Sequence, residues 1–405
     1  MHAVIVDGDV SYPPTSGKRL RTLNLMVRLA ERHQVTYIGR CQRPGAENRQ
    51  ASEFLRDHRI EPILVDDPLP QKKGLLFYGR LAANVVSTWP YSVTSHQSTA
   101  MRQAVHAYAA GHKVDLWQFE WSGYLPAISP AISGPRLLMA HNVDTLIWQR
   151  YHETARGFAK RLFLKQQARK FERFERWAFS HADRVVAVSV EDAALIRDRF
   201  KQPNVDVVEN GIDRDYFMAA HGPREPSRIL FLGALDWRPN QDAVQLLLDK
   251  IFPQVLAEEP AAKLVIVGRD PQPGLVERVA IMPQVELHAN VPDVRPFLAE
   301  SGVMTVPLRI GGGSRLKILE ALACGLPVVS SRVGAEGLQL IPGQHYTVAE
   351  EDTMVAALVH GLRQPQALQA SAAAGRALVL ETYDWGALAN KLDAVWEKTV
   401  VRRPV

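Results

Sequence analysis

The residue types best suited to chemistry gather in one stretch, 308–330, where a run of three glycines precedes Arg315, Lys317 and Glu320. This order predicts a glycine loop that leads into a helix. Glycines let backbone N–H groups approach a ligand closely, and a helix N-terminus attracts anions. Two cations at that point favour a diphosphate, and a carboxylate further along the helix can accept hydrogen bonds from sugar hydroxyls. The stretch therefore indicates a nucleotide-sugar site.

A basic loop, 16–19, follows the first predicted strand and reads Ser-Gly-Lys-Arg. Gly17 and Lys18 could contact a phosphate or an acceptor sugar, and the alternative is an ordinary helix start with basic residues facing solvent. The loop is not a Walker motif, because Tyr12 stands where the first glycine is required and Arg19 replaces the Ser or Thr that would hold Mg²⁺.

Two carboxylates, Asp7 and Asp9, flank a glycine just before this loop. Carboxylates this close could bind a metal ion. At a strand-to-loop turn they more often form the turn or cap a helix, so we expect no metal site here.

Two further predicted strands end in polar residues. Glu120 closes one of them, and His141 and Asn142 follow the next. Such residues project from the carboxyl edge of a parallel sheet, where ligands bind in folds of this kind. A neutral His141 could donate to a sugar hydroxyl or a phosphate near pH 7; alternatively it caps the following helix.

The second half of the chain repeats a strand, glycine loop and helix at 231–240. Asp236 or Asn240 is suited to cap that helix, and Arg238 to contact a phosphate. Gly268 ends another predicted strand in a turn that could line a base pocket. An Asn-Gly pair at 210–211 predicts a further tight loop.

Composition is that of a globular protein, with 46% hydrophobic and 22% charged residues in 405. The net charge of +5 fits an anionic small molecule or membrane surface. We expect no nucleic-acid partner, because basic and aromatic residues do not interleave as in RNA-binding proteins.

The cysteines, Cys41 and Cys324, lie far apart, which favours a reducing compartment. No apolar run reaches the roughly 18 residues of a membrane span, and no signal peptide is recognisable, so we expect a cytoplasmic protein.

The most basic segment is 156–176, where eight cations alternate with apolar residues. A basic amphipathic helix can lie on anionic lipid, which would give peripheral contact with the inner face of the membrane. The alternative is a solvated helix packed on its own domain, with cationic side chains covering apolar surface. A second mixed segment, 67–94, is either a helix bordering the ligand site or a surface helix with one buried stripe.

Short β-branched runs alternate with helical patterns through both halves of the chain. Strands are predicted at 2–6, 35–38, 62–65, 115–119, 137–140 and 184–189, and again at 228–232, 263–267, 285–288, 303–306 and 328–331. Continuous apolar strands between amphipathic helices indicate parallel sheets covered on both faces. We therefore predict an α/β protein with two Rossmann-like doubly wound domains, 1–221 and 222–384, facing a central cleft. A C-terminal helix, 385–405, is expected to pack back towards the first domain.

With these pieces in order, the chain resembles the GT-B-fold retaining glycosyltransferases, specifically glycosyltransferase family 4, also called glycosyl transferases group 1. The resemblance covers nearly the whole chain. It rests on PPTSGKRLR in the N-terminal loop, HN at 141–142, VVENGID at 207–213, FLGALDWRPN at 231–240, VIVG at 265–268 and, most specifically, GGGSRLKILEALACGLPVVS at 311–330.

The resemblance implies a nucleotide-diphospho-sugar donor, a UDP- or GDP-sugar, bound mainly by the C-terminal domain without a cofactor or metal ion. Glu320 matches the carboxylate that usually binds the ribose. The implied catalytic residues are His141, Arg315 and Lys317. The implied donor-binding residues are Gly17, Arg238, Gly268, Gly311, Gly312, Gly313, Ser314, Leu316 and Glu320. Lys18, Glu120 and Asn142 are the implied acceptor-binding residues.

One position departs from the family pattern. The pattern Glu-x7-Glu places its first Glu at 312, where this chain has Gly312. That Glu commonly contacts the hydroxyls of the donor sugar, so the identity of the sugar does not carry over. Arg315 and Lys317 are expected to compensate electrostatically, since stabilising the departing diphosphate is the main catalytic demand.

We predict a glycosyltransferase that moves a sugar from its donor to an acceptor hydroxyl with retention of anomeric configuration, in glycan, exopolysaccharide or glycolipid biosynthesis. The acceptor is expected to be a sugar, a lipid-linked intermediate or a small molecule. Two alternatives stay open: a nucleotide-sugar-binding protein without turnover, which Gly312 motivates, and a non-hydrolysing nucleotide-sugar epimerase. Nucleobase, sugar and acceptor cannot be read from the sequence.

Overall fold

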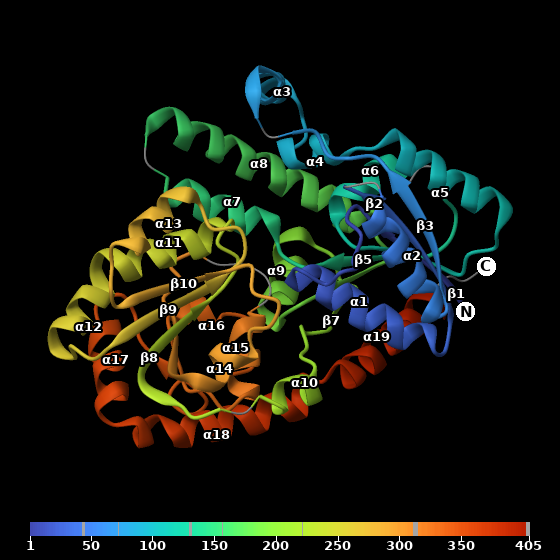
Figure 1. Ribbon diagram of the computed structural model, residues 1–405. Helices are drawn as coiled ribbons and strands as arrows, with labels where there is room; N and C mark the ends of the chain where they lie inside the picture. The colour runs from blue at the N-terminus through green and yellow to red at the C-terminus, as the bar shows by residue number, and fades with distance from the viewer. Residues whose placement is uncertain are drawn as a thin grey trace. The chain divides into compact units, whose positions relative to one another are not determined.

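The computed structural model describes residues 1–42, 45–71, 73–128, 132–155, 157–220, 222–310 and 315–401. These residues form two compact units (Figure 1). Unit 1 contains residues 1–210 together with the C-terminal helix α19 (Trp385–Val401), and unit 2 contains the described residues from 211 to 384.

Unit 1 is built on a seven-stranded parallel sheet in the order β3-β2-β1-β4-β5-β6-β7. Its strands are β1 (His2–Asp7), β2 (Gln34–Cys41), β3 (Ile60–Asp66), β4 (Leu116–Phe119), β5 (Arg136–Ala140), β6 (Arg184–Ala187) and β7 (Val205–Val207). The register is continuous, with Val4 of β1 opposite Thr36 of β2 and Trp117 of β4. The carboxyl ends of β1, β4 and β5, where the predicted site residues lie, therefore share one edge of the sheet.

Helices cover both faces of this sheet. They are α1 (Gly17–Ala30), α2 (Ala46–Asp57), α3 (Gly74–Val86), α4 (Tyr91–His96), α5 (Thr99–Gly111), α6 (Leu125–Ile128), α7 (Asp144–Glu153), α8 (Phe158–Ser180), α9 (Val190–Phe200) and α19, with a 3₁₀ turn at Ser122–Tyr124. Alternate side chains of β1 enter different apolar layers, as the pleat requires. Ala3 and Ile5 pack with α1 and α19, whereas Val4 and Val6 pack with α5, α8 and α9.

Unit 2 repeats the design with a six-stranded parallel sheet in the order β10-β9-β8-β11-β12-β13. Its strands are β8 (Glu225–Leu232), β9 (Lys263–Gly268), β10 (Val285–Ala289), β11 (Ser301–Val306), β12 (Val328–Ser330) and β13 (Thr347–Val348). Its helices are α10 (Arg214–Met218), α11 (Arg238–Leu246), α12 (Phe252–Glu258), α13 (Pro273–Ala280), α14 (Arg295–Glu300), α15 (Leu316–Ala323), α16 (Arg332–Ala335), α17 (Met354–Arg363) and α18 (Pro365–Thr382), with a π-helical turn at Leu247–Ile251 between α11 and α12.

The predicted fold class is confirmed: two doubly wound parallel sheets follow one another along the chain. Every strand predicted from the sequence is present, and the last helix packs on α1 as expected. The short strands β7 and β13 were not predicted. Within the described part of the chain, no helix is both long enough and apolar enough to cross a membrane.

Candidate functional site

The centre of the candidate site in unit 2 is the ammonium group of Lys317, in the first turn of α15. Its Nζ donates a hydrogen bond to Oδ1 of Asn240 at 2.8 Å and lies 4.9 Å from the ring centroid of Phe231. Gly233, directly after β8, leaves the room for this contact. A Cβ added there would lie 2.7 Å from Nζ of Lys317 and 2.8 Å from Nδ2 of Asn240. The same Nδ2 donates to the carbonyl of Ala234 at 2.9 Å, which fixes the amide with its oxygen towards the lysine.

Burial shifts the pKa values of Lys317 and Glu320 towards each other. Burial, and then the charge of Arg315, lower the pKa of Lys317 to about 7. Burial raises the pKa of Glu320 to about 7, against the opposing effect of Lys317. The side-chain carboxylate of Glu320 makes no hydrogen bond or ion pair with another described residue. Both side chains can therefore change charge near neutral pH when a ligand supplies a partner.

Arg315 lies just before α15 and is turned into the protein. It is 4% exposed, and its Nη2 donates to the carbonyl of Val333 at 3.0 Å and lies 3.5 Å from the carboxylate of Glu336. Its charge nevertheless acts on Lys317, whose pKa it helps to lower. In this arrangement Arg315 contributes long-range positive charge. Leu316 is also buried, at 7% exposed, so its backbone is the part available to a donor.

Two other predicted donor residues lie at element boundaries of unit 2. Arg238 is half-buried and begins α11, where Pro239 follows it. Gly268 is the last residue of β9, and a Cβ there would lie 2.0 Å from the carbonyl oxygen of Gly233. The loops after β8 and β9 can approach this closely only because Gly268 has no side chain. The predicted residues Gly311, Gly312, Gly313 and Ser314 lie outside the described residues.

In unit 1 the buried carboxylate of Glu120 links β4, β5 and α1. Its Oε2 accepts from Oγ1 of Thr22 at 2.6 Å and from Nε2 of His141 at 2.9 Å. Its Oε1 accepts from Nε2 of Gln118 at 2.6 Å, and Gln118 in turn accepts from Nε1 of Trp396 on α19 at 2.7 Å. The carboxylate is 1% exposed and both oxygens are occupied. The contacts of Glu120 within the protein favour a role in positioning His141.

The protonation of Glu120 and His141 determines whether His141 can donate a hydrogen bond to a ligand or accept one. Hydrogen bonds and charge from His141, with help from Lys18, outweigh burial and lower the pKa of Glu120 to about 2. Burial lowers the pKa of His141, although Glu120 opposes that shift. An ionised Glu120 only accepts, so Nε2 of His141 carries a proton. In this tautomer a neutral His141 presents Nδ1 as an acceptor, and in the other tautomer Nδ1 would donate.

The two aspartates after β1 are held by cations of α1. Lys18 forms an ion pair with Asp7, and Arg19 makes two hydrogen bonds to Asp9 at 2.6 and 2.8 Å. Tyr37 donates to Asp7 at 3.1 Å. The carboxylates thus anchor the start of α1 through its cations. Among the described residues, no group of three or more His, Cys, Asp and Glu side chains could hold a metal ion.

The remaining predicted residues of unit 1 flank these contacts. Gly17 is the first residue of α1, and Ser16 caps that helix by accepting from the backbone N–H of Arg19 at 3.3 Å. Asn142 is half-buried and lies between β5 and α7, next to His141. Glu120 and His141 are joined by a hydrogen bond, and Lys18 acts on Glu120 through its charge.

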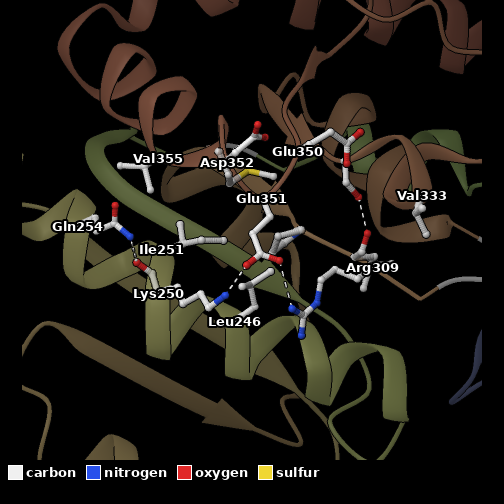
Figure 2. Close-up of a pocket in the computed structure, with 14 residues that line it drawn as sticks. Leu246, Lys250, Ile251, Gln254, Arg309, Val333, Glu350, Glu351, Asp352 and Val355 are labelled. Atoms are coloured by element: carbon white, nitrogen blue, oxygen red, sulfur yellow. Dashed lines mark hydrogen bonds and ion pairs between the residues drawn. The ribbon is translucent and has the colours of Figure 1, made fainter. Parts of the chain in front are cut away.

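A cavity of about 630 Å³ lies elsewhere in unit 2 (Figure 2). None of the predicted site residues that the structure describes lines it. Figure 2 shows Glu351 between Lys250 and Arg309: Glu351 accepts from Lys250 at 2.6 Å and from Arg309 at 3.2 Å. Arg309 also makes two hydrogen bonds to Asp242. Because these charges are paired within the protein, the cavity is a weaker candidate for an anion site than the surroundings of Lys317.

Several residues that contact Lys317 in unit 2 or surround Glu120 in unit 1 were not predicted as site residues, or were assigned only a capping role. Asn240 was considered, with Asp236, as a cap of α11; it lies inside that helix and accepts from Lys317. Phe231 and Thr22 carried no signal, because an apolar strand residue and a helical threonine are common everywhere. Arg21 is 1% exposed and donates to the carbonyl of Val208 at 2.6 Å. Its charge lies close enough to Glu120 and His141 to affect both, yet on the sequence it is one more cation of a basic helix.

Comparison with known proteins places the chain in a family. Residues 17–216 match the family model described as Glycosyltransferase Family 4, and residues 226–364 match the model described as Glycosyl transferases group 1. The chain belongs to glycosyltransferase family 4. Glu120 and His141 lie inside the first matched region, and Lys317 and Glu320 lie inside the second. The family assignment agrees with the two parallel sheets.

Curated relatives of this family 4 protein are distant. It is 25% identical over 279 residues to glycogen synthase of Mycobacterium tuberculosis, which covers 65% of this chain and 66% of that one. It is 29% identical over 233 residues to phosphatidyl-myo-inositol mannosyltransferase of Mycobacterium leprae, which covers 54% of this chain and 60% of that one. The chain thus spans about two thirds or less of the length of these relatives. Among solved structures, sucrose-phosphate synthase of Thermosynechococcus elongatus has a similar fold, with a TM-score of 0.70, 16% identity and coverage of 98% of this chain and 99% of that one.

Proposed function

We propose that this protein transfers a sugar from a nucleotide-diphospho-sugar to an acceptor hydroxyl, with retention of anomeric configuration. The observation that carries the proposal is the ammonium group of Lys317, which is hydrogen-bonded to a neutral amide and whose pKa is lowered by burial and by the charge of Arg315. Nothing in that arrangement cancels its charge except Glu320, which burial itself drives towards the neutral form. A diphosphate would provide the missing negative charge.

The donor's parts can be assigned to residues of unit 2. Lys317 is the direct ligand of the diphosphate, and Arg315 supplies further positive charge from its buried position. The unpaired carboxylate of Glu320 suits the ribose hydroxyls. Gly268 lies where the loop after β9 begins, and Arg238 lies where the loop after β8 ends. Both loops lie at the carboxyl edge of the sheet, where ligands bind in this fold. The described residues do not distinguish a uracil from a guanine donor.

In unit 1, His141 is the proposed contact to the transferred sugar, accepting from one of its hydroxyls at Nδ1. Glu120 acts through His141 and is a positioning residue. Asn142, Gly17 and Lys18 are the remaining candidates for contact with donor and acceptor. A lipid-linked acceptor is supported by one relative, the phosphatidyl-myo-inositol mannosyltransferase of Mycobacterium leprae, whose name gives a lipid as its acceptor.

The chemistry needs no nucleophile from the protein. The bond between the anomeric carbon and the diphosphate oxygen breaks, the acceptor oxygen bonds to the same face of that carbon, and the acceptor's proton passes to the departing diphosphate oxygen. Negative charge grows on the leaving group as the bond breaks. Fixed positive groups that face this charge lower the barrier, because they are already oriented before the reaction.

The test begins with a thermal-shift screen of UDP, GDP and ADP, because a specific ligand raises the melting temperature. Donor sugars of the best base are then assayed for turnover, and NMR of the product identifies its anomer. We expect Lys317→Ala and Glu320→Ala each to lower kcat/KM at least tenfold, with Lys250→Ala, in the separate cavity, as the matched control. Unchanged kcat/KM in both variants would show that the site is assigned wrongly.

Two other outcomes would replace the proposal. Nucleotide binding without turnover of any donor would indicate a nucleotide-sugar-binding protein, the alternative that Gly312 motivates. Conversion of the donor alone into a stereoisomer would indicate an epimerase. An inverted product would leave transfer in place and contradict retention.

A further inference from the structure

Helix α3 exposes apolar side chains that no described residue of unit 1 covers. Leu75, Leu76 and Val86 are 90%, 80% and 89% exposed, and Tyr78 is 66% exposed. The inward side of the helix is already satisfied, since Phe77 packs edge-to-face on Tyr91 with the ring centroids 5.9 Å apart. An apolar face of this kind on an otherwise folded unit marks an interaction surface.

The C-terminal end of α3 is fastened to the basic helix α8. Nε2 of Gln166 donates to the carbonyl of Val85 at 2.9 Å, and Nε2 of Gln167 donates to Oδ1 of Asn84 at 3.0 Å. Nζ of Lys170 donates to the carbonyl of Val85 at 3.2 Å. Figure 1 shows α3 standing out from unit 1 beside α8. The two helices therefore present one continuous surface.

The first half of α8 adds cations and further apolar groups to this surface. Phe158 and Leu162 are 84% and 59% exposed. The exposed cations of α8 are Lys160, Arg161, Lys165, Arg169, Arg173 and Arg176. Neither α3 nor residues 158–171 of α8 contain an acidic residue. The polar side of this half of the helix is therefore uniformly positive.

We propose that the exposed residues of α3 and of 158–169 in α8, called here the α3/α8 surface, dock on a membrane that contains anionic lipid. Leucine, valine and phenylalanine side chains insert at the level of the headgroups, and the flanking lysines and arginines bind lipid phosphates. Charge complementarity favours this occupant over a second copy of the chain, because two identical surfaces of like charge repel each other. This inference goes beyond the proposed function, since docking requires neither a donor nor turnover.

The experiment is flotation of the full chain with vesicles of phosphatidylcholine, with and without 30 mol% phosphatidylglycerol. We expect binding at least tenfold tighter to the anionic vesicles, weakening as salt screens the cations. The variant Leu75→Ser/Leu76→Ser and the variant Lys160→Glu/Arg161→Glu should each lose binding at least tenfold. All four side chains are exposed, so folding should persist, which circular dichroism and the melting temperature verify.

Matched controls replace residues of the same types that do not belong to the α3/α8 surface. Ile281→Ser, at an 82% exposed position of unit 2, tests apolar loss, and Arg102→Glu/Lys113→Glu on and after α5 tests charge reversal. Both should bind vesicles as the unmodified chain does. Equal binding to neutral and anionic vesicles, or equal loss in the controls, would overturn the proposal. So would self-association that Leu75→Ser/Leu76→Ser abolishes while vesicle binding is absent. Turnover of a water-soluble donor and acceptor should be unchanged in all variants, so a failure of docking is distinguishable from a failure of the proposed activity.

Discussion

Lys317 and Asn240 are joined by a hydrogen bond of 2.8 Å that connects the first turn of α15 to the first turn of α11. The amide oxygen satisfies one N–H of the ammonium group without cancelling its charge. Burial therefore still lowers the pKa of Lys317 to about 7, well below the ordinary value for lysine. A pKa this low makes the charge of Lys317 sensitive to pH near neutrality, and a bound anion would favour its protonated form.

This relationship predicts the pH dependence of nucleotide binding. A diphosphate raises the pKa of Lys317 above 7, so its contribution to affinity is full below pH 7 and declines as the pH rises towards 9. Lys317→Met should weaken binding about 10- to 100-fold at pH 6.5 and less at pH 9, because it removes a charged hydrogen bond that exists only when lysine is protonated. Calorimetry in buffers of different ionisation enthalpy measures the proton uptake. A ratio of the two affinities that stays constant from pH 6.5 to 9 would contradict the prediction, and Lys250→Met is the control.

A second prediction concerns the close approach of the loops after β8 and β9. In Gly268→Ala the new methyl group would lie 2.0 Å from the carbonyl oxygen of Gly233 and 2.8 Å from Cγ of Leu235, so backbone has to move. We expect a loss of about 1–3 kcal/mol in the free energy of unfolding, measured by denaturant titration, together with weaker nucleotide binding. Gly274→Ala is the matched control. Its Cβ would meet nothing within 4 Å, so it should be neutral or slightly stabilising. Equal effects of the two substitutions would rule out the steric explanation.

The fold was predictable because its strands are continuous apolar runs between amphipathic helices. β9 is an example: Leu264, Val265, Ile266 and Val267 are all fully buried. β13 could not be predicted in this way, since it has two residues and is recognisable only from its pairing with β12. The neighbour order of strands is likewise set by the whole sheet and not by any local pattern.

The candidate site was predictable as far as local spacing reaches. Lys317 and Glu320 lie three residues apart on one helix, which places them on the same face, and the sequence shows this directly. Asn240 comes from a segment 77 residues earlier, and only the adjacency of β8 and β11 brings it to Lys317. The bond between Glu120 and His141 similarly depends on the pairing of β4 with β5. The proposed ligands were therefore easier to recognise than the residues that contact them.

A third prediction concerns the buried carboxyl groups where α7 begins. Burial, and then the charge of Asp144, raise the pKa of Glu175 to about 8, and no cation lies among the causes. A folded-state pKa above the unfolded value of about 4.3 stabilises the protein at low pH and loses that effect as the pH rises through 8. Glu175→Gln should therefore flatten the pH dependence of the unfolding free energy between about pH 5 and 8.

The control for this prediction is Glu172, which lies on α8 as Glu175 does. Glu172 is partly exposed and pairs with Arg199 at 3.0 Å, so Glu172→Gln should change stability by about 1 kcal/mol or less and keep the slope. Chemical denaturation at several pH values measures both variants. A slope that Glu175→Gln leaves unchanged would show that Glu175 is ionised throughout this range.

The last prediction tests whether Glu120 orients His141 for contact with the sugar. Glu120→Gln removes the negative charge that raises the pKa of His141 against the effect of burial, so that pKa should fall further. NMR titration of the His141 ring measures the shift and the tautomer. Gln can still accept at one atom, so the protein should fold, whereas kcat should drop about tenfold or more with little change in the KM for the donor. Thr22→Val removes another hydrogen bond to Glu120 at 2.6 Å without touching His141, and it should leave the tautomer unchanged. An unaltered pKa and tautomer in Glu120→Gln would show that Glu120 is structural and does not act through His141.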